Sequence, residues 1–198
     1  MKIAEIFESL QGEGPLMGRP MLFIRLSGCN LSCEWCDTKY AQDVGRDMKV
    51  DEVADAIEKC EFEYVCWTGG EPLLQADEIM SVVKRTAHKR HCLETNGTLN
   101  IPHGSFYAVI ASPKDLCKQP PSNADYFKFV TRPDGFDDVV RYVNTHSMER
   151  DRIFIQPLSA EGEDIMEANR SLWVLCVREG FSLSPRLHIM MFGNKRGI

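Results

Sequence analysis

Three cysteines stand close together in a segment that is also rich in small and polar residues. Cys29, Cys33 and Cys36 have the spacing Cys-x3-Cys-x2-Cys, within the run Ser-Gly-Cys-Asn-Leu-Ser-Cys-Glu-Trp-Cys-Asp-Thr. A [4Fe–4S] cluster has four irons and usually takes four thiolates. A compact loop that offers three leaves one iron without a protein ligand, and such an open position can bind a substrate or cofactor. The spacing therefore predicts a catalytic iron–sulfur cluster.

Zinc binding and disulfide formation are the alternative uses of these cysteines. A structural zinc site needs a fourth Cys or His at matching spacing, and Cys60 and Cys66 do not form a second pair of this kind. The start of the chain has no apolar stretch long enough for a signal peptide or a membrane span. Eight cysteines in such a chain favour a reducing cytoplasm, where clustered cysteines bind metals. No role is assigned to the five scattered cysteines, which are Cys60, Cys66, Cys92, Cys117 and Cys176.

The size and charge of the chain fit one compact enzyme domain over residues 1–198. A chain of 198 residues is long enough to bury a substantial core, and its composition, 43% apolar and 26% charged, is ordinary for a globular protein. The net charge is −6, whereas nucleic-acid-binding surfaces are usually basic. We therefore expect a protein that binds neither nucleic acid nor a membrane.

The chain alternates between short apolar runs and amphipathic segments. The runs predict strands at 21–27, 63–68, 91–95, 107–111, 126–130 and 152–156, and most lack the alternation of a half-exposed strand. Apolar stripes predict helices at 50–59, 76–87 and 161–179, the last ending at Gly180. The connections at 96–106 and 112–125 are too short or too rich in Pro and Gly for full helices. The pattern predicts an α/β fold: a partial (β/α)6 barrel with parallel strands, an incomplete helix set and its chemistry at the carboxyl ends of the strands.

Polar clusters recur where the predicted strands end. Thr68-Gly-Gly-Glu-Pro-Leu73 follows the second strand, and its paired glycines let the backbone approach a ligand closely. Glu94-Thr-Asn-Gly97, Ser112-Pro-Lys114 and Gln156-Pro-Leu-Ser159 follow three later strands. Each cluster taken alone is also a good turn or helix cap. Their recurrence at successive strand ends favours one shared polar site.

The cysteine spacing and the Gly-Gly-Glu-Pro turn together resemble the radical S-adenosylmethionine (SAM) superfamily, in which SAM chelates the open iron. The resemblance narrows when other segments are included, and it then spans essentially the whole chain. The chain is similar to the 7-carboxy-7-deazaguanine synthase family of queuosine biosynthesis. The segments that carry this likeness are Ser9-Leu-Gln-Gly-Glu-Gly14, Phe23-Ile-Arg-Leu26, Cys36-Asp-Thr38, Ser184-Pro-Arg-Leu-His-Ile189 and Lys195-Arg-Gly-Ile198.

The resemblance implies a reaction and a set of site residues. Members of that family convert 6-carboxy-5,6,7,8-tetrahydropterin to 7-carboxy-7-deazaguanine with loss of ammonia, and they use a [4Fe–4S] cluster, recycled SAM and Mg²⁺. No protein residue is expected to be the principal catalyst, because a 5′-deoxyadenosyl radical is the reactive species. By this likeness the three cysteines ligate the cluster and Thr38 ligates Mg²⁺. SAM is contacted by Trp35, Asp37, Gly70, Ser112, Lys114 and Gln156. The pterin is contacted by Leu10, Gln11, Gly12, Arg25, Thr68 and Ile198, with an N-terminal substrate loop and a C-terminal tail that closes the site.

Elementary chemistry is consistent with two of these assignments. The planar guanidinium of Arg25 suits a carboxylate. Mg²⁺ prefers oxygen ligands, such as the hydroxyl of Thr38, in octahedral geometry. Two other functions remain open: a radical SAM activase that acts on a protein partner, and a non-catalytic iron–sulfur or zinc-binding module. A flavodoxin-like electron donor and a homodimer are expected from the family alone.

Overall fold

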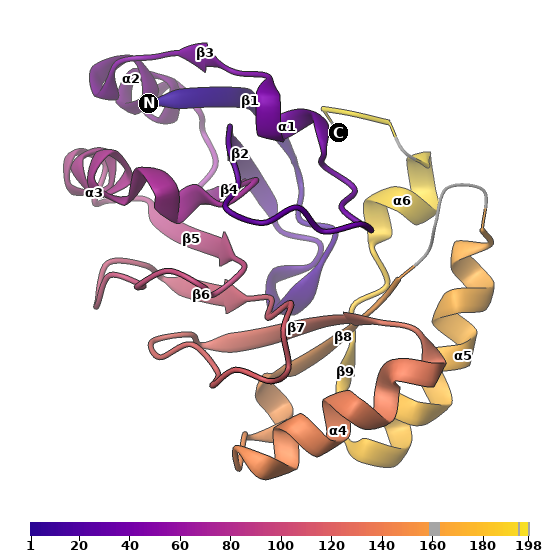
Figure 1. Cartoon of the computed structure of the whole chain (residues 1–198). Helices are drawn as coiled ribbons and strands as arrows, with labels where there is room; N and C mark the ends of the chain where they lie inside the picture. Colours follow the sequence, from indigo (N-terminus) through magenta and orange to yellow (C-terminus); the bar gives the residue numbers. More distant parts are fainter. Residues whose placement is uncertain (159–162, 194, 198) are drawn as a thin grey trace.

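Nine strands form one sheet in the computed structural model, which describes residues 1–158, 163–193 and 195–197 (Figure 1). The strand order is β3-β1-β2-β4-β5-β6-β7-β8-β9, so β3 and β9 are its edges. All six strands predicted from the sequence are present within one or two residues of their expected bounds. They are β2 (Pro20–Leu26), β4 (Tyr64–Gly69), β5 (Arg90–Thr95), β6 (Ala108–Ala111), β7 (Tyr126–Thr131) and β8 (Ile153–Pro157).

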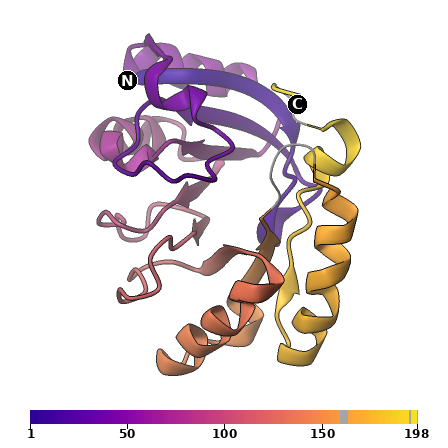
Figure 2. The ribbon, with the colours of Figure 1, turned by 45° about the vertical axis from the view of Figure 1, so that its right-hand side comes forward.

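These six strands run parallel to one another in chain order, which confirms the predicted α/β class. Helices return the chain between several of them, but the connections from β5 to β6 and from β6 to β7 contain none, as their composition predicts. The parallel arrangement brings the carboxyl ends of β2 to β8 to the same end of the sheet. The strands form an open, curved sheet, as expected for a partial barrel (Figures 1 and 2).

Four helices pack on one face of this sheet. They are α2 (Val50–Lys59), α3 (Ala76–Arg85), α4 (Phe136–Thr145) and α5 (Ile165–Glu179). Their apolar stripes meet the strands in one large core, with α2 and α3 over one half of the sheet and α4 and α5 over the other (Figures 1 and 2). Helix α5 ends at Gly180, whose φ of 71° is the left-handed conformation of a C-terminal cap, as predicted.

The two faces of the sheet differ because successive side chains of a strand point to opposite sides. On β2, Leu22, Ile24 and Leu26 face the helices, while Met21 and Phe23 belong to a second, smaller core on the inner face. Arg25 follows Phe23 on that inner face, next to the carboxyl end of the strand. Its Cα is paired in register with that of Thr68 on β4.

Some elements were not among the predicted ones. The long strand β1 (Lys2–Leu10) pairs antiparallel with β2, and a bulge between Ile3 and Glu5 interrupts its alternation. Strands β3 (Arg46–Asp47) and β9 (Ser182–Leu183) have two residues each, too short for a periodic pattern. Two short helices complete the fold, α1 (Tyr40–Asp43) and α6 (Leu187–Phe192). Within the described residues, no helix has both the length and the apolarity needed to cross a membrane.

Candidate active site

The three cysteines lie on the loop that joins β2 to α1. All are half-buried and none is in a disulfide. The loop is tied at its start by a hydrogen bond from the Gly28 amide to the Ala41 carbonyl (2.9 Å). Burial raises the pKa of the Cys29 thiol, and the neighbouring Glu71, Cys33 and Cys36 add to this rise. The spacing thus places all three thiols on one loop, at the carboxyl end of the sheet.

The Gly-Gly-Glu-Pro turn packs directly against this loop. A Cβ on Gly70 would lie 2.1 Å from the Gly28 carbonyl oxygen and 2.9 Å from Cys29 Cβ, so only glycine fits there. The amide of Glu71 donates to the same Gly28 carbonyl (2.9 Å). The turn that follows β4 and the loop that carries the thiols therefore form one packed unit.

Glu71 is a fully buried carboxylate that fastens this unit to the next strand end. It accepts hydrogen bonds from the Thr95 hydroxyl (2.8 Å), the Asn96 amide (2.7 Å) and the Leu73 amide (3.0 Å). Burial raises its pKa, although these hydrogen bonds partly oppose the rise. The carboxylate stands at the start of the short 3-10 helix Pro72–Gln75 and caps it.

The loop after β5 also holds the cysteine loop from its other side. Asn96 Nδ2 donates to Asn30 Oδ1 (2.9 Å), and Asn30 Nδ2 donates to the Thr98 hydroxyl (2.8 Å). Asn30 is the residue next to Cys29. The Glu94-Thr-Asn-Gly97 segment, singled out in the sequence as a polar cluster, thus positions the first cysteine.

Five polar residues gather on the inner face of the sheet, and we call them the inner-face cluster: Gln11, Glu13, Thr68, Glu94 and Lys128. Glu94 accepts from Gln11 Nε2 (2.9 Å) and from the Thr68 hydroxyl (3.3 Å). Lys128 forms an ion pair with Glu13, and its Nζ lies 3.9 Å from Glu94 Oε2. The cluster unites the loop after β1 with β4, β5 and β7.

The charges of this cluster depend on one another. Burial disfavours ionisation of Glu13, but Lys128, together with His188 and Arg186, outweighs burial and lowers the pKa of that carboxyl. Burial likewise opposes the charge of Lys128, yet Glu13 and Glu94 raise its pKa. Two carboxylates around one ammonium group give the inner-face cluster a net negative charge when all three are ionised, so the cluster can accept hydrogen bonds from a ligand.

A segment from the C-terminal part of the chain covers the loop after β1. The Leu187 amide donates to the Gly12 carbonyl (2.8 Å), and the Gly14 amide donates to the Ser184 hydroxyl (2.9 Å). A Cβ on Gly12 would lie 2.1 Å from His188 Nδ1, so glycine is required for this approach. The imidazole of His188 has its pKa lowered by burial. The segment thereby forms a wall beside the predicted substrate loop.

The same segment reaches the cysteine loop. Arg186 Nη1 lies 3.2 Å from Asp37 Oδ2, across 149 positions of the chain. Asp37, predicted to contact SAM, is therefore held by an arginine of the C-terminal segment. Thr38, the predicted Mg²⁺ ligand, lies next to it with its hydroxyl 3.7 Å from Cys36 Sγ.

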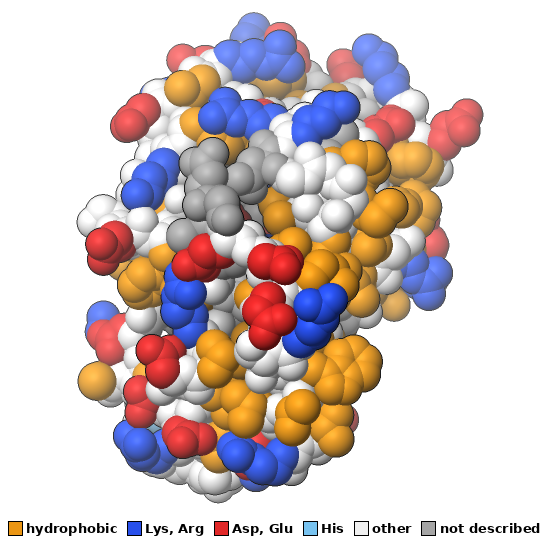
Figure 3. Space-filling model, turned by 90° about the vertical axis from the view of Figure 1, so that its right-hand side faces the viewer, with side chains coloured by type: hydrophobic (Ala, Val, Ile, Leu, Met, Phe, Trp, Pro, Cys, Tyr) orange, Lys and Arg blue, Asp and Glu red, His pale blue; other side chains and the backbone are white. Residues whose placement is uncertain are grey.

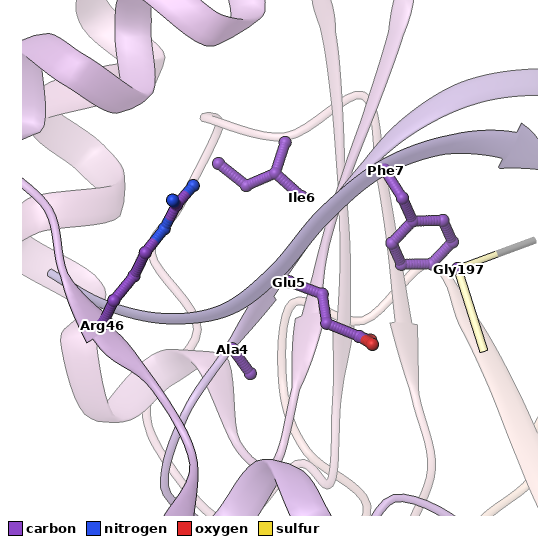
Figure 4. A pocket seen from close by; sticks show the side chains of 6 residues that line it. All are labelled: Ala4, Glu5, Ile6, Phe7, Arg46 and Gly197. Carbon is purple, nitrogen blue, oxygen red and sulfur yellow. The ribbon is translucent and has the colours of Figure 1, made fainter.

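Arg25 is oriented by a glutamate of the neighbouring strand. Its Nε donates to Glu5 Oε2 (3.0 Å), and the Tyr40 hydroxyl donates to the same oxygen (2.7 Å). Glu5 also lines a cavity of about 360 Å³ beside β1. Figure 4 shows its carboxylate on the same side of the strand as Phe7 and Gly197. Among the predicted site residues that the structure describes, none lines this cavity, and Glu5 connects it to the site through its hydrogen bond with Arg25.

The remaining predicted residues fall into four groups. Lys114 Nζ donates to the Ser112 hydroxyl (2.7 Å), and burial, reinforced by Lys128, lowers the pKa of Lys114. Gln156 is buried at the end of β8, and its Oε1 accepts no hydrogen bond from the described residues. Trp35 and Leu10 are about half exposed at the rim. Ile198 lies outside the described residues.

Several residues of this site were not assigned from the sequence, namely Glu13, Glu71, Glu94, Lys128, Arg186 and His188. Glu13, Glu71 and Glu94 lie inside sequence motifs that are described above. The carboxylate in each motif is therefore a signal by which these residues could have been assigned. Lys128 stands between Phe127 and Phe129 in an apolar run. A charged residue in such a run is itself a signal, because an unpaired buried ammonium is costly.

The chemistry of the site fits a three-thiolate cluster with SAM as its partner. One loop carries all three thiols, Gly70 leaves room only for backbone beside that loop, and Gln156 presents a buried, unpartnered acceptor. Within the described part of the chain, no three His, Cys, Asp or Glu side chains are close enough to hold a single metal ion. The fit therefore rests on the types and placement of the donors.

Comparisons with known proteins agree with this arrangement. A sequence profile of the radical SAM superfamily matches residues 23–105, which include the cysteine loop and the Gly-Gly-Glu-Pro turn. The crystal structure of QueE from Escherichia coli is similar in fold, with a TM-score of 0.72 and 24% identity over 92% of each chain.

Similarity of sequence extends over the whole chain. The 7-carboxy-7-deazaguanine synthase of Pyrobaculum aerophilum is 35% identical over 227 residues, covering 100% of this chain and 97% of that protein. The enzymes of the same name from Hyperthermus butylicus and Thermoplasma acidophilum are 36% and 34% identical and span 92% and 100% of their own lengths. Family members of the radical SAM type use a [4Fe–4S] cluster and SAM. The chain belongs to the 7-carboxy-7-deazaguanine synthase family of radical SAM enzymes.

Proposed function

We propose that this protein converts 6-carboxy-5,6,7,8-tetrahydropterin to 7-carboxy-7-deazaguanine with loss of ammonia. The proposal rests on two parts of the molecule that lie next to each other. One is the loop that carries Cys29, Cys33 and Cys36, called the thiol loop from here on, with the Gly-Gly-Glu-Pro turn packed against it. The other is the inner-face cluster, with the C-terminal segment that covers the loop after β1. When bound, the cluster and SAM supply a 5′-deoxyadenosyl radical that abstracts hydrogen from the pterin. The residues of the chain bind, orient and exclude water.

We infer that Cys29, Cys33 and Cys36 hold the cluster. The SAM subsite next to it uses the backbone at Gly70, the Ser112–Lys114 pair, the acceptor of Gln156, and the rim residues Trp35 and Asp37. The close packing of Gly70 on Cys29 supports this assignment, because it places the Gly70 backbone next to the loop that carries the thiols. Lys114 is suited to the SAM carboxylate, since an ammonium group can pair with it.

The pterin subsite extends from the thiol loop along the inner face of the sheet. Gln11, Gly12, Arg25 and Thr68 line it in this proposal, with Leu10 at its mouth and Ile198 at the tail. Glu5 fixes the Arg25 guanidinium at its Nε, which leaves the two outer nitrogens for the substrate carboxylate. The hydrogen bonds from Gln11 and Thr68 to Glu94 support a common subsite.

Mg²⁺ belongs to the same proposal, with Thr38 as its protein ligand. The hydroxyl lies 3.7 Å from Cys36 Sγ, which supports a position next to the cluster. Mg²⁺ keeps several waters and often binds through few protein oxygens. A single threonine with the substrate's own oxygens is thus a sufficient ligand set.

The proposal also covers the domain organisation, the electron donor and the oligomeric state. Residues 1–198 act as one radical SAM core domain, with an N-terminal loop for the substrate and a C-terminal tail that closes the site. An electron donor resembling flavodoxin reduces the protein, which works as a homodimer. The hydrogen bonds of Gly12 and Gly14 with Leu187 and Ser184 support the closing role of the C-terminal segment.

The test is a product assay on anaerobically reconstituted protein. Reduced protein is mixed with 6-carboxytetrahydropterin, SAM and Mg²⁺, and the products are separated by liquid chromatography with mass detection. We expect 7-carboxy-7-deazaguanine in many-fold molar excess over enzyme, with SAM conserved across turnovers. Iron and sulfide with SAM cleavage but no pterin product would instead favour an activase. Zinc without sulfide would overturn the enzyme assignment.

A further inference from the structure

Helix α5 is apolar on two sides, although only one of them packs on the sheet. Leu172 and Cys176 are buried against the strands. Away from that core, Trp173 is 62% exposed and Val177 is 71% exposed, with Met166 at 41% near the start of the helix. A surface helix normally carries one apolar stripe, which faces the core. An exposed patch of large apolar side chains marks an interaction site.

These exposed side chains lie on one line along the helix. Met166, Arg170, Trp173 and Val177 follow one another at steps of four, three and four residues, so they share one stripe. We call this the α5 stripe. Arg170 is its only charged member, and its guanidinium has one weak partner, Glu167 at 3.4 Å, with both side chains 66% exposed. A pair so exposed contributes little to stability, so Arg170 remains available to a binding partner.

The α5 stripe is complementary to itself when two copies run antiparallel. The pair Met166 and Val177 and the pair Arg170 and Trp173 are centred on the same point of the helix. That point lies between positions 171 and 172. A two-fold axis at that point sets Met166 against Val177 of the second copy and Arg170 against its Trp173. The apolar residues at the two ends of the stripe then contact each other. The guanidinium of Arg170, the only charge in the stripe, faces the indole ring of Trp173, and indole is the best partner for a cation–π contact. In a two-fold interface, residue i contacts j and j contacts i, as here.

The area is sufficient for a specific interface. The patch continues past the start of α5 to α6, which packs next to it and exposes Met191 and Phe192. Figure 3 faces this side of the molecule and shows apolar side chains gathered over it, interrupted by a band of charges. Covering the six exposed apolar side chains, Val174 included, on two copies would bury roughly 1,200 Å², the lower end of the range for specific interfaces.

We propose that the α5 stripe is the interface between two copies of this chain, packed antiparallel across a two-fold axis. This names the surface for the two-copy assembly given above, and it does not depend on the reaction. The proposed substrate and SAM subsites lie at the carboxyl end of the sheet and include no residue of the α5 stripe. Loss of the dimer and loss of the chemistry are therefore separable.

Sedimentation velocity of the full, cluster-loaded protein tests the proposal. Wild type should sediment as a dimer. Trp173→Arg should weaken the dimer about tenfold or more, because arginines would then face each other in both central pairs. The double variant Arg170→Trp with Trp173→Arg should regain the dimer, since it exchanges the two partners within the same register. Ser171→Glu, on the polar flank of the same helix, should sediment like wild type.

Each outcome decides the matter. Circular dichroism and iron content confirm that each variant is folded and loaded. A wild-type monomer at the highest soluble concentration would overturn the proposal. So would a folded Trp173→Arg variant that remains a dimer, because another surface would then hold the copies together. A Trp173→Arg monomer that the exchanged double variant fails to rescue would overturn the antiparallel register.

Discussion

The two faces of the sheet differ in how the polarity of their side chains changes along each strand. Toward the helices the side chains are mostly apolar, as from Leu22 through Ile24 to Leu26 on β2, with buried polar exceptions such as His91 on β5. On the inner face they change character along the strand. Apolar residues at the amino ends give way to polar ones at the carboxyl ends: Phe23 to Arg25, Cys66 to Thr68, Cys92 to Glu94, Ile110 to Ser112, Tyr126 to Lys128 and Phe154 to Gln156.

The helix-covered face therefore contributes mainly to stability, and the inner face contributes mainly to the chemistry of the site. The helix-covered face can hold the sheet together by burial alone, at about 25 cal/mol for each Å² of apolar surface. The inner face places its hydrogen-bonding groups in one layer, at the end where the thiol loop lies. Substitutions on the two faces should therefore fail in different ways, and the following changes are ordered from the largest expected effect to the smallest.

The first change removes a thiol. Cys33→Ala should abolish product formation and stable cluster binding, because the loop has no spare thiolate. Cys176→Ala, in the core between α5 and the sheet, should lose about 1 kcal/mol of stability and keep its cluster. Iron and sulfide analysis with the product assay compares the two. Full turnover by Cys33→Ala with a normal cluster would refute the proposed role of the thiol loop.

The second change breaks the buried ion pair of the inner face. Lys128→Met leaves Glu13 and Glu94 without their cation, and removal of one partner from a buried pair costs about 3 kcal/mol. The pKa of Glu13 is lowered in the folded protein, so this stabilisation is full at neutral pH and is lost as the pH falls through that folded pKa. Urea unfolding at pH 7 measures the loss.

Two controls sharpen this measurement. Ile155→Val on the opposite face should cost only about 1 kcal/mol, since it removes one methylene. The double variant Lys128→Met with Glu13→Gln should be more stable than Lys128→Met alone, because the unpaired charge is gone. If it were not, the Glu13–Lys128 pair would be coupled too weakly to matter.

The third change concerns the hydroxyl of Thr38. Thr38→Ala should keep its cluster and cleave SAM slowly, yet lose most of the Mg²⁺ stimulation of product formation. Thr38→Ser keeps the oxygen and should keep much of that stimulation. A Mg²⁺ titration of turnover distinguishes ligation from a hydrogen bond within the loop. An identical response in wild type and Thr38→Ala would remove Thr38 from the site.

The smallest effect belongs to a histidine on the helix-covered side. Trp67 Nε1 donates to His91 Nδ1 (3.1 Å), and His91 Nε2 lies 3.0 Å from the Thr86 carbonyl oxygen. Burial lowers the pKa of His91, and the neighbouring His88 and Lys89 lower it further, although the hydrogen bond with the Thr86 carbonyl partly opposes the change. The unfolded chain then binds a proton more readily than the folded one. The free energy of unfolding should fall as the pH drops below about 6.5, until the folded pKa is passed.

His91→Gln isolates this contribution, since it keeps an acceptor for Trp67 but cannot titrate. The slope of unfolding free energy against pH between 5 and 7 should be shallower in the variant than in wild type. Product formation at neutral pH should not change. Equal slopes would show that His91 is already neutral in both states or equally protonated in both.

The six central strands and the thiol loop could be predicted because their signals are local. Each strand is a short apolar run buried on both faces, and the cysteines identify themselves by spacing. Strand β1 was missed because its bulge at Ile3–Glu5 breaks the alternation that reveals an antiparallel strand. Helix α4 was not foreseen either. Its buried residues Phe136, Val139, Tyr142 and Val143 do have helical spacing, so the signal was present in the sequence, although no side-chain cap marks the start of the helix.

The polar network of the site could not be derived from local pattern. Glu71 meets Thr95 and Asn96, and Gln11 meets Glu94, only because parallel strands bring their ends together. Lys128 reads as one charge in an apolar strand until Glu13, 115 positions away, is placed beside it. Contacts between distant segments depend on register and topology, which periodicity does not encode.

The contact between Arg186 and Asp37 also has a consequence for how the protein is made. The two residues are 149 positions apart, and ribosomes add about 5–20 residues each second. The thiol loop therefore leaves the ribosome roughly 7 to 30 seconds before the segment that will cover it. During that interval the cysteines are more open to iron–sulfur carriers, and to oxygen, than in the finished fold. Slower translation of the intervening residues would lengthen the time available for both cluster delivery and thiol oxidation.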